Sequence, residues 1–142
     1  MTLKQSNSRV SVYATDTHPL IWYASRTYRQ LSPRALQVFE QAESGEAFIL
    51  IPAPVLWEVS MLDKAGHITL NKPVEQWLRD LLQKPCFDQI PLDADIISES
   101  RAYNFNNDIF DAAIVATARL RDVPLITKDA AIINSGLVEI YW

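Results

Sequence analysis

Four acidic side chains interrupt the apolar segments of this 142-residue chain, and they constrain its fold more than any other feature. Asp16 and Asp129 each end a strand-like run, while Glu58 and Asp111 lie within apolar, helix-like stretches. A carboxylate in apolar surroundings is costly unless it is paired or binds a metal. Four such residues, spread over the whole chain, therefore predict one shared cation site and hence a metal-dependent enzyme.

The composition is that of one ordinary globular domain. The chain is 49% hydrophobic and 21% charged, which is enough for a real core over residues 10–142. The polar segment 1–9 lacks the apolar centre of a signal peptide and is predicted to be a flexible tail. No apolar run approaches the roughly 20 residues that span a bilayer. Cys86 is the only cysteine, so no disulfide framework is expected and the chain fits a reducing, cytoplasmic environment.

The charge balance limits how the chain can hold nucleic acid. The formal net charge is −4 and the isoelectric point is near 5.1, which argues against a broad basic surface. It does not exclude a nuclease, because a cluster of carboxylates lowers the net charge and is partly neutralised by its metal. Contacts with nucleic acid are therefore expected only at a local site and not over a broad surface.

Strand-like and helix-like segments alternate along the chain. Strands are predicted over residues 10–15, 48–51, 87–91, 124–127 and 138–142, with a short extended piece at 68–70. Helices are predicted over residues 17–23, 35–42, 54–65, 73–83, 94–103 and 108–121. This order predicts an α/β fold: a three-layer α/β/α sandwich around a central, mainly parallel sheet. Sites in such sheets form beyond the carboxyl ends of the strands, where Asp16 and Asp129 lie.

Each acid also has a simpler explanation. Asp16 can cap a helix, Glu58 can be an exposed residue of an amphipathic helix, and Asp129 can start a turn. Asp108 fits the first turn of a helix that Asn106 or Asn107 would cap, where a carboxylate complements the helix dipole. Asp111 lies one turn deeper in the most apolar helix of the chain, and this explanation fits it poorly.

Taken together, the acids point to a hard divalent cation. All four, with Asp108 as a fifth candidate, supply only oxygen ligands, which suits Mg²⁺ or Mn²⁺. His18 and His67 are isolated, and they are predicted to be a structural hydrogen-bond donor and a loop residue. Such ions favour substrates with phosphate oxygens and can assist phosphodiester hydrolysis. With three glycines, the chain has no Walker A or dinucleotide-binding loop.

Four blocks of sequence carry these acids in order. They read Asp16-Thr17-His18-Pro19, Leu56-Trp57-Glu58-Val59, Asn107-Asp108-Ile109-Phe110-Asp111-Ala112 and Leu125-Ile126-Thr127-Lys128-Asp129. In this order and spacing they resemble the PIN-domain ribonucleases, in particular the VapC-like toxins of bacterial toxin–antitoxin pairs. The resemblance covers nearly all of the chain after residue 9.

The resemblance implies both an activity and partners. It implies a PIN-like fold and Mg²⁺- or Mn²⁺-dependent endoribonuclease activity. The catalytic and metal-binding acids would be Asp16, Glu58, Asp111 and Asp129, and Thr127 would support the site. An RNA substrate, a cognate antitoxin and a homodimer are implied as well. The chain departs from the frequent family pattern at two positions of the third block, where Ile109 replaces a proline and Ala112 replaces an arginine.

Two other functions remain open on the sequence. A PIN-like module without activity could hold RNA or protein, although the intact acids argue against it. A receiver-like signalling domain also has acids and a lysine at strand ends, but its central aspartate is expected after a middle strand. Residues 48–51, taken as that strand, end in Pro52 instead. Candidate phosphate contacts, from charge and rough position, are Arg26, Arg29, Lys64 and Lys128.

Overall fold

Five parallel strands form the central sheet of the computed structural model, which describes residues 10–142. The predicted tail at 1–9 lies outside the described residues. The sheet order is β3-β2-β1-β4-β5, and every pairing is parallel. The strands are β1 (Ser11–Thr15), β2 (Ala47–Pro52), β3 (Phe87–Ile90), β4 (Leu125–Ile126) and β5 (Ile140–Tyr141). The predicted α/β sandwich with a mainly parallel sheet is confirmed.

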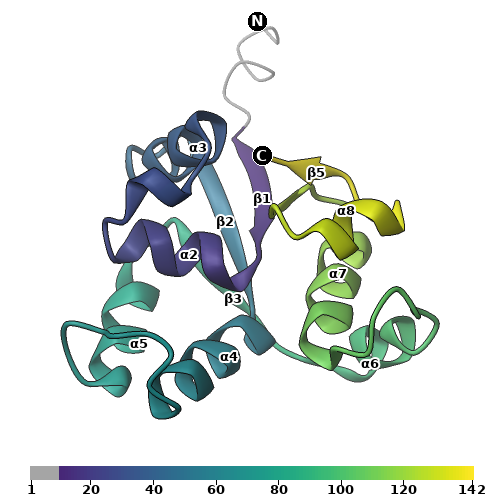
Figure 1. The fold of residues 1–142 in the computed structure, drawn as a ribbon. Helices are drawn as coiled ribbons and strands as arrows, with labels where there is room; N and C mark the ends of the chain where they lie inside the picture. The colour runs from purple at the N-terminus through teal and green to yellow at the C-terminus, as the bar shows by residue number, and fades with distance from the viewer. Residues whose placement is uncertain (1–9) are drawn as a thin grey trace, which may run out of the picture.

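Helices cover both faces of this sheet. Figure 1 shows α2, α3 and α5 on one side of the strands and α6, α7 and α8 on the other. Helix α4 contacts α2 and α5 as well as α7, so it links the two helical layers. The helices are α2 (Thr17–Ala24), η1 (Tyr28–Gln30), α3 (Pro33–Glu43), α4 (Ala53–Lys64), α5 (Val74–Gln83), α6 (Ala94–Ser100), α7 (Ile109–Arg121) and α8 (Ala130–Ser135).

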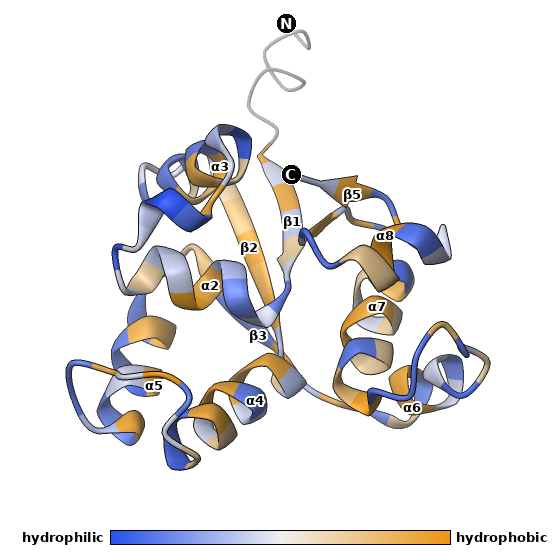
Figure 2. Cartoon of the chain, in the orientation of Figure 1, coloured by the Kyte–Doolittle hydropathy of each residue, from blue (hydrophilic) through white to orange (hydrophobic). Residues whose placement is uncertain are grey.

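Local sequence explains most of these elements. Helix α3 has Pro33 in its first turn, and the Ser32 hydroxyl accepts from the backbone N–H of Ala35 at 3.0 Å. Strand β2 is mostly hydrophobic (Figure 2), and it buries Ala47, Ile49 and Ile51 on one face while Phe48 on the other stays exposed. Helix α7 buries six consecutive residues, from Ala113 to Ala118. These two elements supply much of the core under the candidate site.

Several details differ from the sequence predictions. Residues 68–70 form no strand, and α6 ends three residues before the predicted 103, at Ser100. The short helices η1 and α8 were not predicted. They are brief segments of three and six residues, too short for a helical period to show in the sequence. None of the helices in residues 10–142 combines the length and apolar character that a membrane crossing requires.

The strand order creates a switch point beside Asp16. Strand β1 pairs with β2 on one side and with β4 on the other, with Ala14 opposite Leu125 in the β1–β4 pair. Strands β2 and β3 therefore follow β1 on one side of it, and the chain then crosses to its other side to add β4 and β5. Such a point is where parallel sheets open a crevice at their carboxyl edge. Asp16 directly follows β1, and Asp129 comes three residues after Ile126, the last residue of β4.

Candidate active site

Asp16 is the most enclosed of the four acids, with 9% of its surface exposed. It caps α2: its Oδ1 accepts from the backbone N–H of Thr17 at 2.8 Å. Its Oδ2 accepts from the hydroxyl of Thr127 at 2.7 Å, across the β1–β4 pair. Burial raises the pKa of Asp16, and the nearby charge of Asp129 adds to the rise against these two hydrogen bonds. The simple capping role is real, but it leaves a buried carboxylate without a cationic partner.

Glu58 reaches the same place from helix α4. The hydroxyl of Thr17 donates to its Oε1 at 2.5 Å, which joins residues 41 positions apart in the chain. Burial again raises the pKa of Glu58, and repulsion from Asp16 and Asp108 raises it further. Glu58 is half-buried, so it is not the exposed helix residue that the simpler interpretation required.

Asp111 lies in the first turn of α7, and its environment is the most distinctive of the four. Burial raises its pKa to about 7, with further repulsion from Asp16, Asp108 and Asp129. The side-chain amide of Asn106 donates to its Oδ2 at 3.0 Å and partly opposes the rise. The charges of Asp111 and Asp16 therefore repel each other, although the two residues are far apart in the sequence.

Asp108 is the N-cap of α7, which corrects the prediction that Asn106 or Asn107 caps this helix. The carboxylate of Asp108 accepts from the backbone N–H groups of Phe110 at 2.8 Å and Asp111 at 3.3 Å. Asn106 instead donates from its side-chain amide to Asp111, and its side-chain oxygen accepts from the backbone N–H of Asp108. The helix begins one residue later than predicted because Asp108 adopts an extended backbone and takes the capping position.

Asp129 caps α8, and Thr127 links it to Asp16. The Oδ1 of Asp129 accepts from the backbone N–H of Ile132 at 3.0 Å. The hydroxyl oxygen of Thr127 accepts from the backbone N–H of Asp129 at 3.0 Å while its hydrogen is donated to Asp16. The predicted supporting position of Thr127 thus corresponds to a buried hydroxyl that ties the ends of β1 and β4 together.

No basic side chain of the described residues neutralises these acids. Among residues 10–142, the ion pairs are Lys72–Asp80, Lys84–Glu43 and Arg119–Glu99, and none includes a site acid. In that same range, no three Asp, Glu, His or Cys side chains are drawn together closely enough to hold a metal ion. The acids thus lie near enough to repel one another without forming a closed ligand set. Which of them bind a metal or act in catalysis stays a prediction.

The family model of the PIN domain matches residues 13–135 of this chain. The matched segment contains all four acids, the last three residues of β1, and the whole of β2, β3 and β4. The chain belongs to the PIN domain family. No curated protein sequence matches it significantly.

Solved structures with the same fold include several toxin–antitoxin proteins. Rickettsia felis VapBC2, bound to a DNA fragment from its promoter, has a TM-score of 0.65 and 14% identity, and the match covers 92% of this chain and 99% of that one. Mycobacterium tuberculosis VapC20, a toxin that cleaves the sarcin–ricin loop, has a TM-score of 0.63 and 14% identity, over 93% and 100% of the two chains. A Klebsiella pneumoniae toxin–antitoxin complex has a TM-score of 0.51 and 25% identity, over 82% and 86%.

Sequence reasoning misses two polar contacts of this PIN domain. It does not identify Thr17 as a partner of Glu58, and it suggests only a helix cap for Asn106. The one available signal is that Thr17 directly follows Asp16, because residues next to the end of a strand lie at the same edge of the sheet. Nothing in the sequence connects Asn106 to the side chain of Asp111, since the loop before α7 has no regular period.

His18 does not have its predicted role. It is exposed, and within the described residues it donates no hydrogen bond. Its ring lies tilted against Trp22, with 5.7 Å between the centroids. A positive charge on His18 lowers the pKa of Asp16 and Glu58, so it is an electrostatic neighbour of the acids. His67 lies in the loop after α4, as predicted.

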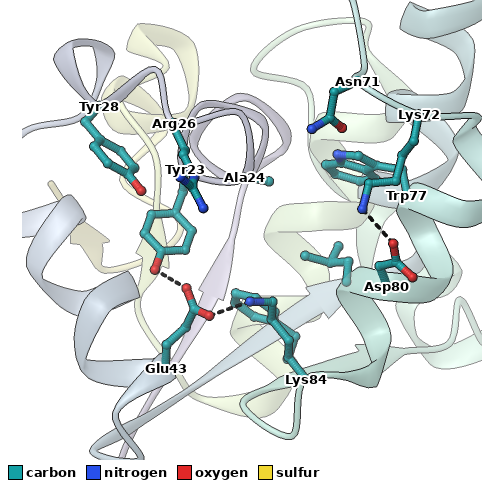
Figure 3. Close-up of a pocket in the computed structure, with 12 residues that line it drawn as sticks. Tyr23, Ala24, Arg26, Tyr28, Glu43, Asn71, Lys72, Trp77, Asp80 and Lys84 are labelled. Atoms are coloured by element: carbon teal, nitrogen blue, oxygen red, sulfur yellow. Dashed lines mark hydrogen bonds and ion pairs between the residues drawn. The ribbon is translucent and has the colours of Figure 1, made fainter.

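A separate hollow of about 520 Å³ lies away from the acids (Figure 3). It opens between the end of α2, the end of α3 and α5, and none of the four acids lines it. Glu43 sits in it between Tyr23 and Lys84, and Asp80 pairs with Lys72. Arg26, one of the candidate phosphate contacts, lines this hollow and not the acidic site.

Proposed function

We propose that this PIN domain is a metal-dependent endoribonuclease whose acidic site comprises Asp16, Glu58, Asp111 and Asp129. The observation that carries the proposal is that three acids from distant parts of the chain, Asp16, Glu58 and Asp111, are buried or half-buried with no ion-pair partner among the described residues. This burial raises the pKa of each of them. In each case burial is the largest cause, and repulsion from neighbouring acids adds to it. A structural carboxylate normally has a cation or several donors to offset such a cost, so this arrangement favours a role that needs the charge.

The donor set fits a hard divalent cation. The four acids supply only oxygen atoms, which is the preference of Mg²⁺ and Mn²⁺, and no histidine or cysteine competes among them. The proposed ligands are Asp16, Glu58, Asp111 and Asp129, with Asp108 as an outer candidate because it already caps α7. When bound, such an ion lowers the pKa of a water molecule and stabilises the leaving oxygen of a phosphodiester.

Neighbouring side chains orient these acids for such a role. The Thr127 hydroxyl fixes one oxygen of Asp16, the Thr17 hydroxyl fixes one oxygen of Glu58, and the Asn106 amide fixes one oxygen of Asp111. Each of these carboxylates keeps accepting capacity beyond the bond described. Held ligands of this kind reduce the cost of ordering a site when the ion arrives.

The sheet order disfavours a receiver-like signalling domain. Receiver proteins of the doubly wound type have the order 2-1-3-4-5, whereas this sheet has β3-β2-β1-β4-β5. The sequence-based reason against that function was wrong: the central strand is β1, which ends at Asp16, and not the strand before Pro52. An inactive PIN-like binding module remains the second candidate, and cleavage assays separate it from the enzyme.

Cleavage of RNA by the purified protein tests the proposal. An unstructured single-stranded RNA should be cut internally in the presence of Mg²⁺ or Mn²⁺ and left intact when a chelator removes the ion. The variant Asp111→Asn should bind RNA without cutting it. Wild-type protein that folds, binds RNA and never cuts it would establish the inactive binding module instead.

The same proposal includes a toxin role in the cytoplasm, with an antitoxin as partner. The PIN-domain structures that this chain resembles include toxin–antitoxin complexes from Rickettsia felis and Klebsiella pneumoniae. Induced expression of the wild-type chain alone should arrest growth, while the Asp111→Asn variant should be tolerated. Normal growth with confirmed accumulation of folded wild-type protein would contradict the toxin role. The homodimer implied by the resemblance stays a prediction.

A further inference from the structure

We propose that Lys128 contacts an RNA phosphate beside the acidic site, and that the indole rings of Trp22 and Trp142 hold its ammonium group ready for this contact. This inference rests on the proposed ribonuclease function and assigns a substrate-binding residue to it. It concerns a side chain that takes no part in the proposed metal site.

The backbone of Lys128 is fixed by the site itself. Its preceding neighbour Thr127 donates to Asp16 at 2.7 Å, and its following neighbour Asp129 caps α8. The N–H of Asp129 also donates to the Thr127 hydroxyl oxygen at 3.0 Å, which closes a tight turn around Lys128. The lysine therefore projects from the segment that joins two of the four acids.

Aromatic rings hold the charged end of Lys128. Its Nζ lies 4.9 Å from the centroid of the Trp22 ring and 5.9 Å from that of Trp142. The two indole rings pack edge to face, 6.4 Å apart, and Trp22 also touches His18. A cation over an aromatic face is attracted by the ring, so the long side chain loses part of its freedom before any ligand arrives.

The charge of Lys128 has no carboxylate partner among the described residues. Within residues 10–142 it forms no ion pair, whereas Lys72, Lys84 and Arg119 each pair with an acid. Lys128 is also exposed. A chain with a net charge of −4 repels RNA at long range, so an available cation next to the acids supplies the local attraction that phosphates need.

A purely structural role has a different signature. Lys128 could serve only to attach Trp142, which follows the two-residue strand β5, to helix α2. Removing the charge would then lower the melting temperature and leave RNA binding unchanged at temperatures where the protein is folded. A phosphate contact instead changes the salt dependence of binding, because it releases counterions from the RNA.

The test compares Lys128→Met, Lys128→Arg and Arg34→Met, each in the non-cutting Asp111→Asn background. Met keeps the apolar stem of lysine on the indole rings, and Arg keeps the charge. Arg34 is the matched control, because it also stacks on an aromatic ring, 4.4 Å from the centroid of Tyr141, but extends from α3, which carries none of the four acids. Binding of an unstructured single-stranded RNA is measured over a range of salt concentrations.

The expected result separates the three variants. Lys128→Met should weaken binding about tenfold at low salt, as expected for one charged hydrogen bond. It should also reduce the slope of log Kobs against log salt by about 0.7, the value for one phosphate of a single strand. Lys128→Arg and Arg34→Met should keep the parental slope. In the otherwise wild-type protein, Lys128→Met should raise KM and change kcat little.

Two results would overturn the inference. An unchanged salt slope for Lys128→Met, with a lowered melting temperature, would leave Lys128 as a clamp for the C-terminal strand. An equal loss in Arg34→Met would show that net charge alone matters. In both cases cleavage by the wild-type protein would still stand, so failure of this inference is distinct from failure of the proposed function, in which the wild type neither binds nor cuts RNA.

Discussion

Two regions of this molecule hold acidic side chains in opposite ways. At the carboxyl ends of β1 and β4, burial and mutual repulsion raise the pKa values of Asp16 and Asp111, and neither acid forms an ion pair among the described residues. In the hollow beside α2, Glu43 accepts from Lys84 and from Tyr23, and these contacts hold its pKa below the ordinary value. The first region carries unbalanced negative charge, whereas the second has balanced its charge internally.

The difference separates carboxylates that serve the fold from carboxylates available to a ligand. Glu43 strengthens its region as it stands, because the lysine, the tyrosine and the acid satisfy one another (Figure 3). Asp111 weakens its region unless something positive arrives from outside. Four predictions break or sharpen this comparison, beginning with the largest expected effect.

The largest contrast is expected in catalysis. Asp111→Asn and Glu58→Gln should each lower RNA cleavage by on the order of 10²–10⁴-fold, the range for loss of a group that acts on the reacting atoms. Glu43→Gln should stay within about twofold of the wild type, because Glu43 lines the separate hollow and its charge is paired with Lys84. Initial cleavage rates on one RNA, at saturating Mg²⁺ or Mn²⁺, make the measurement.

Asp108→Asn supplies the internal control for this first prediction. Asn is as good a helix cap as Asp, so the start of α7 should survive and activity should fall much less than in Asp111→Asn. Equal losses at these two positions would place Asp108 among the acids of the site and contradict its assignment as a helix cap alone.

The second prediction concerns metal binding and stability. Mg²⁺ or Mn²⁺ well above its dissociation constant should stabilise the native protein by on the order of 1–3 kcal/mol, because the ion binds only the assembled acids. Asp16→Asn should lose most of this gain and keep its capping bond to Thr17. Glu43→Gln should retain the gain in full. Melting temperatures with and without the ion provide the readout.

Metal-induced stabilisation that persists in Asp16→Asn would show that the ion binds at a site that does not include Asp16. Calorimetry must accompany the melting curves, since it detects binding that has little effect on stability. If the wild type bound no metal at all, there would be no shared metal site, and the uncompensated negative charge of these acids would have no explanation.

The two regions also show how far the sequence leads. The four acids and their strand ends follow from local patterns, because an acid after a β-branched run or inside an apolar helix is conspicuous. The topology that brings β1 beside β4 depends on pairings between distant segments. The same holds for the contacts of Thr17 with Glu58 and of Asn106 with Asp111. Charge balance in the hollow is invisible too, since Glu43 and Lys84 are 41 residues apart.

The third prediction is an opposite response to pH in metal-free buffer. The folded-state pKa of Asp111 is raised to about 7 from an ordinary 3.8, so the folded state binds its proton more tightly than the unfolded state does. Its cost to stability is therefore fully present above about pH 7 and disappears as the pH falls toward 4. Asp111→Asn should be more stable than the wild type at about pH 8, by on the order of 1 kcal/mol for a partly exposed group.

Glu43→Gln should respond with the reverse sign. The pKa of Glu43 is lowered in the folded state, so its stabilising effect is present above its ordinary pKa of 4.5 and is lost only as the pH falls further. This variant should melt below the wild type at both about pH 8 and about pH 5.5, whereas the advantage of Asp111→Asn should shrink between them. Chemical denaturation at the two pH values measures both. Parallel pH profiles for the two variants would contradict the opposite charge balance of the two regions.

The smallest effect is expected at the rim of the hollow, where Lys72 meets Asp80. Their charged atoms are 2.6 Å apart, but the side chains keep 33% and 41% of their surface exposed, so water and salt screen the pair. Lys72→Met, Asp80→Asn and the double variant should give a coupling energy of about 0–1 kcal/mol, which falls further in high salt. Glu43 and Lys84 are about as exposed, at 35% and 48%, so the hydrogen bond from Tyr23 to Glu43 is the one difference that should make this pair couple more strongly in the same double-mutant cycle. A coupling for Lys72–Asp80 that equals or exceeds that of Glu43–Lys84 would mean that the tyrosine adds nothing and that simple ion pairing accounts for the balanced charge of this region.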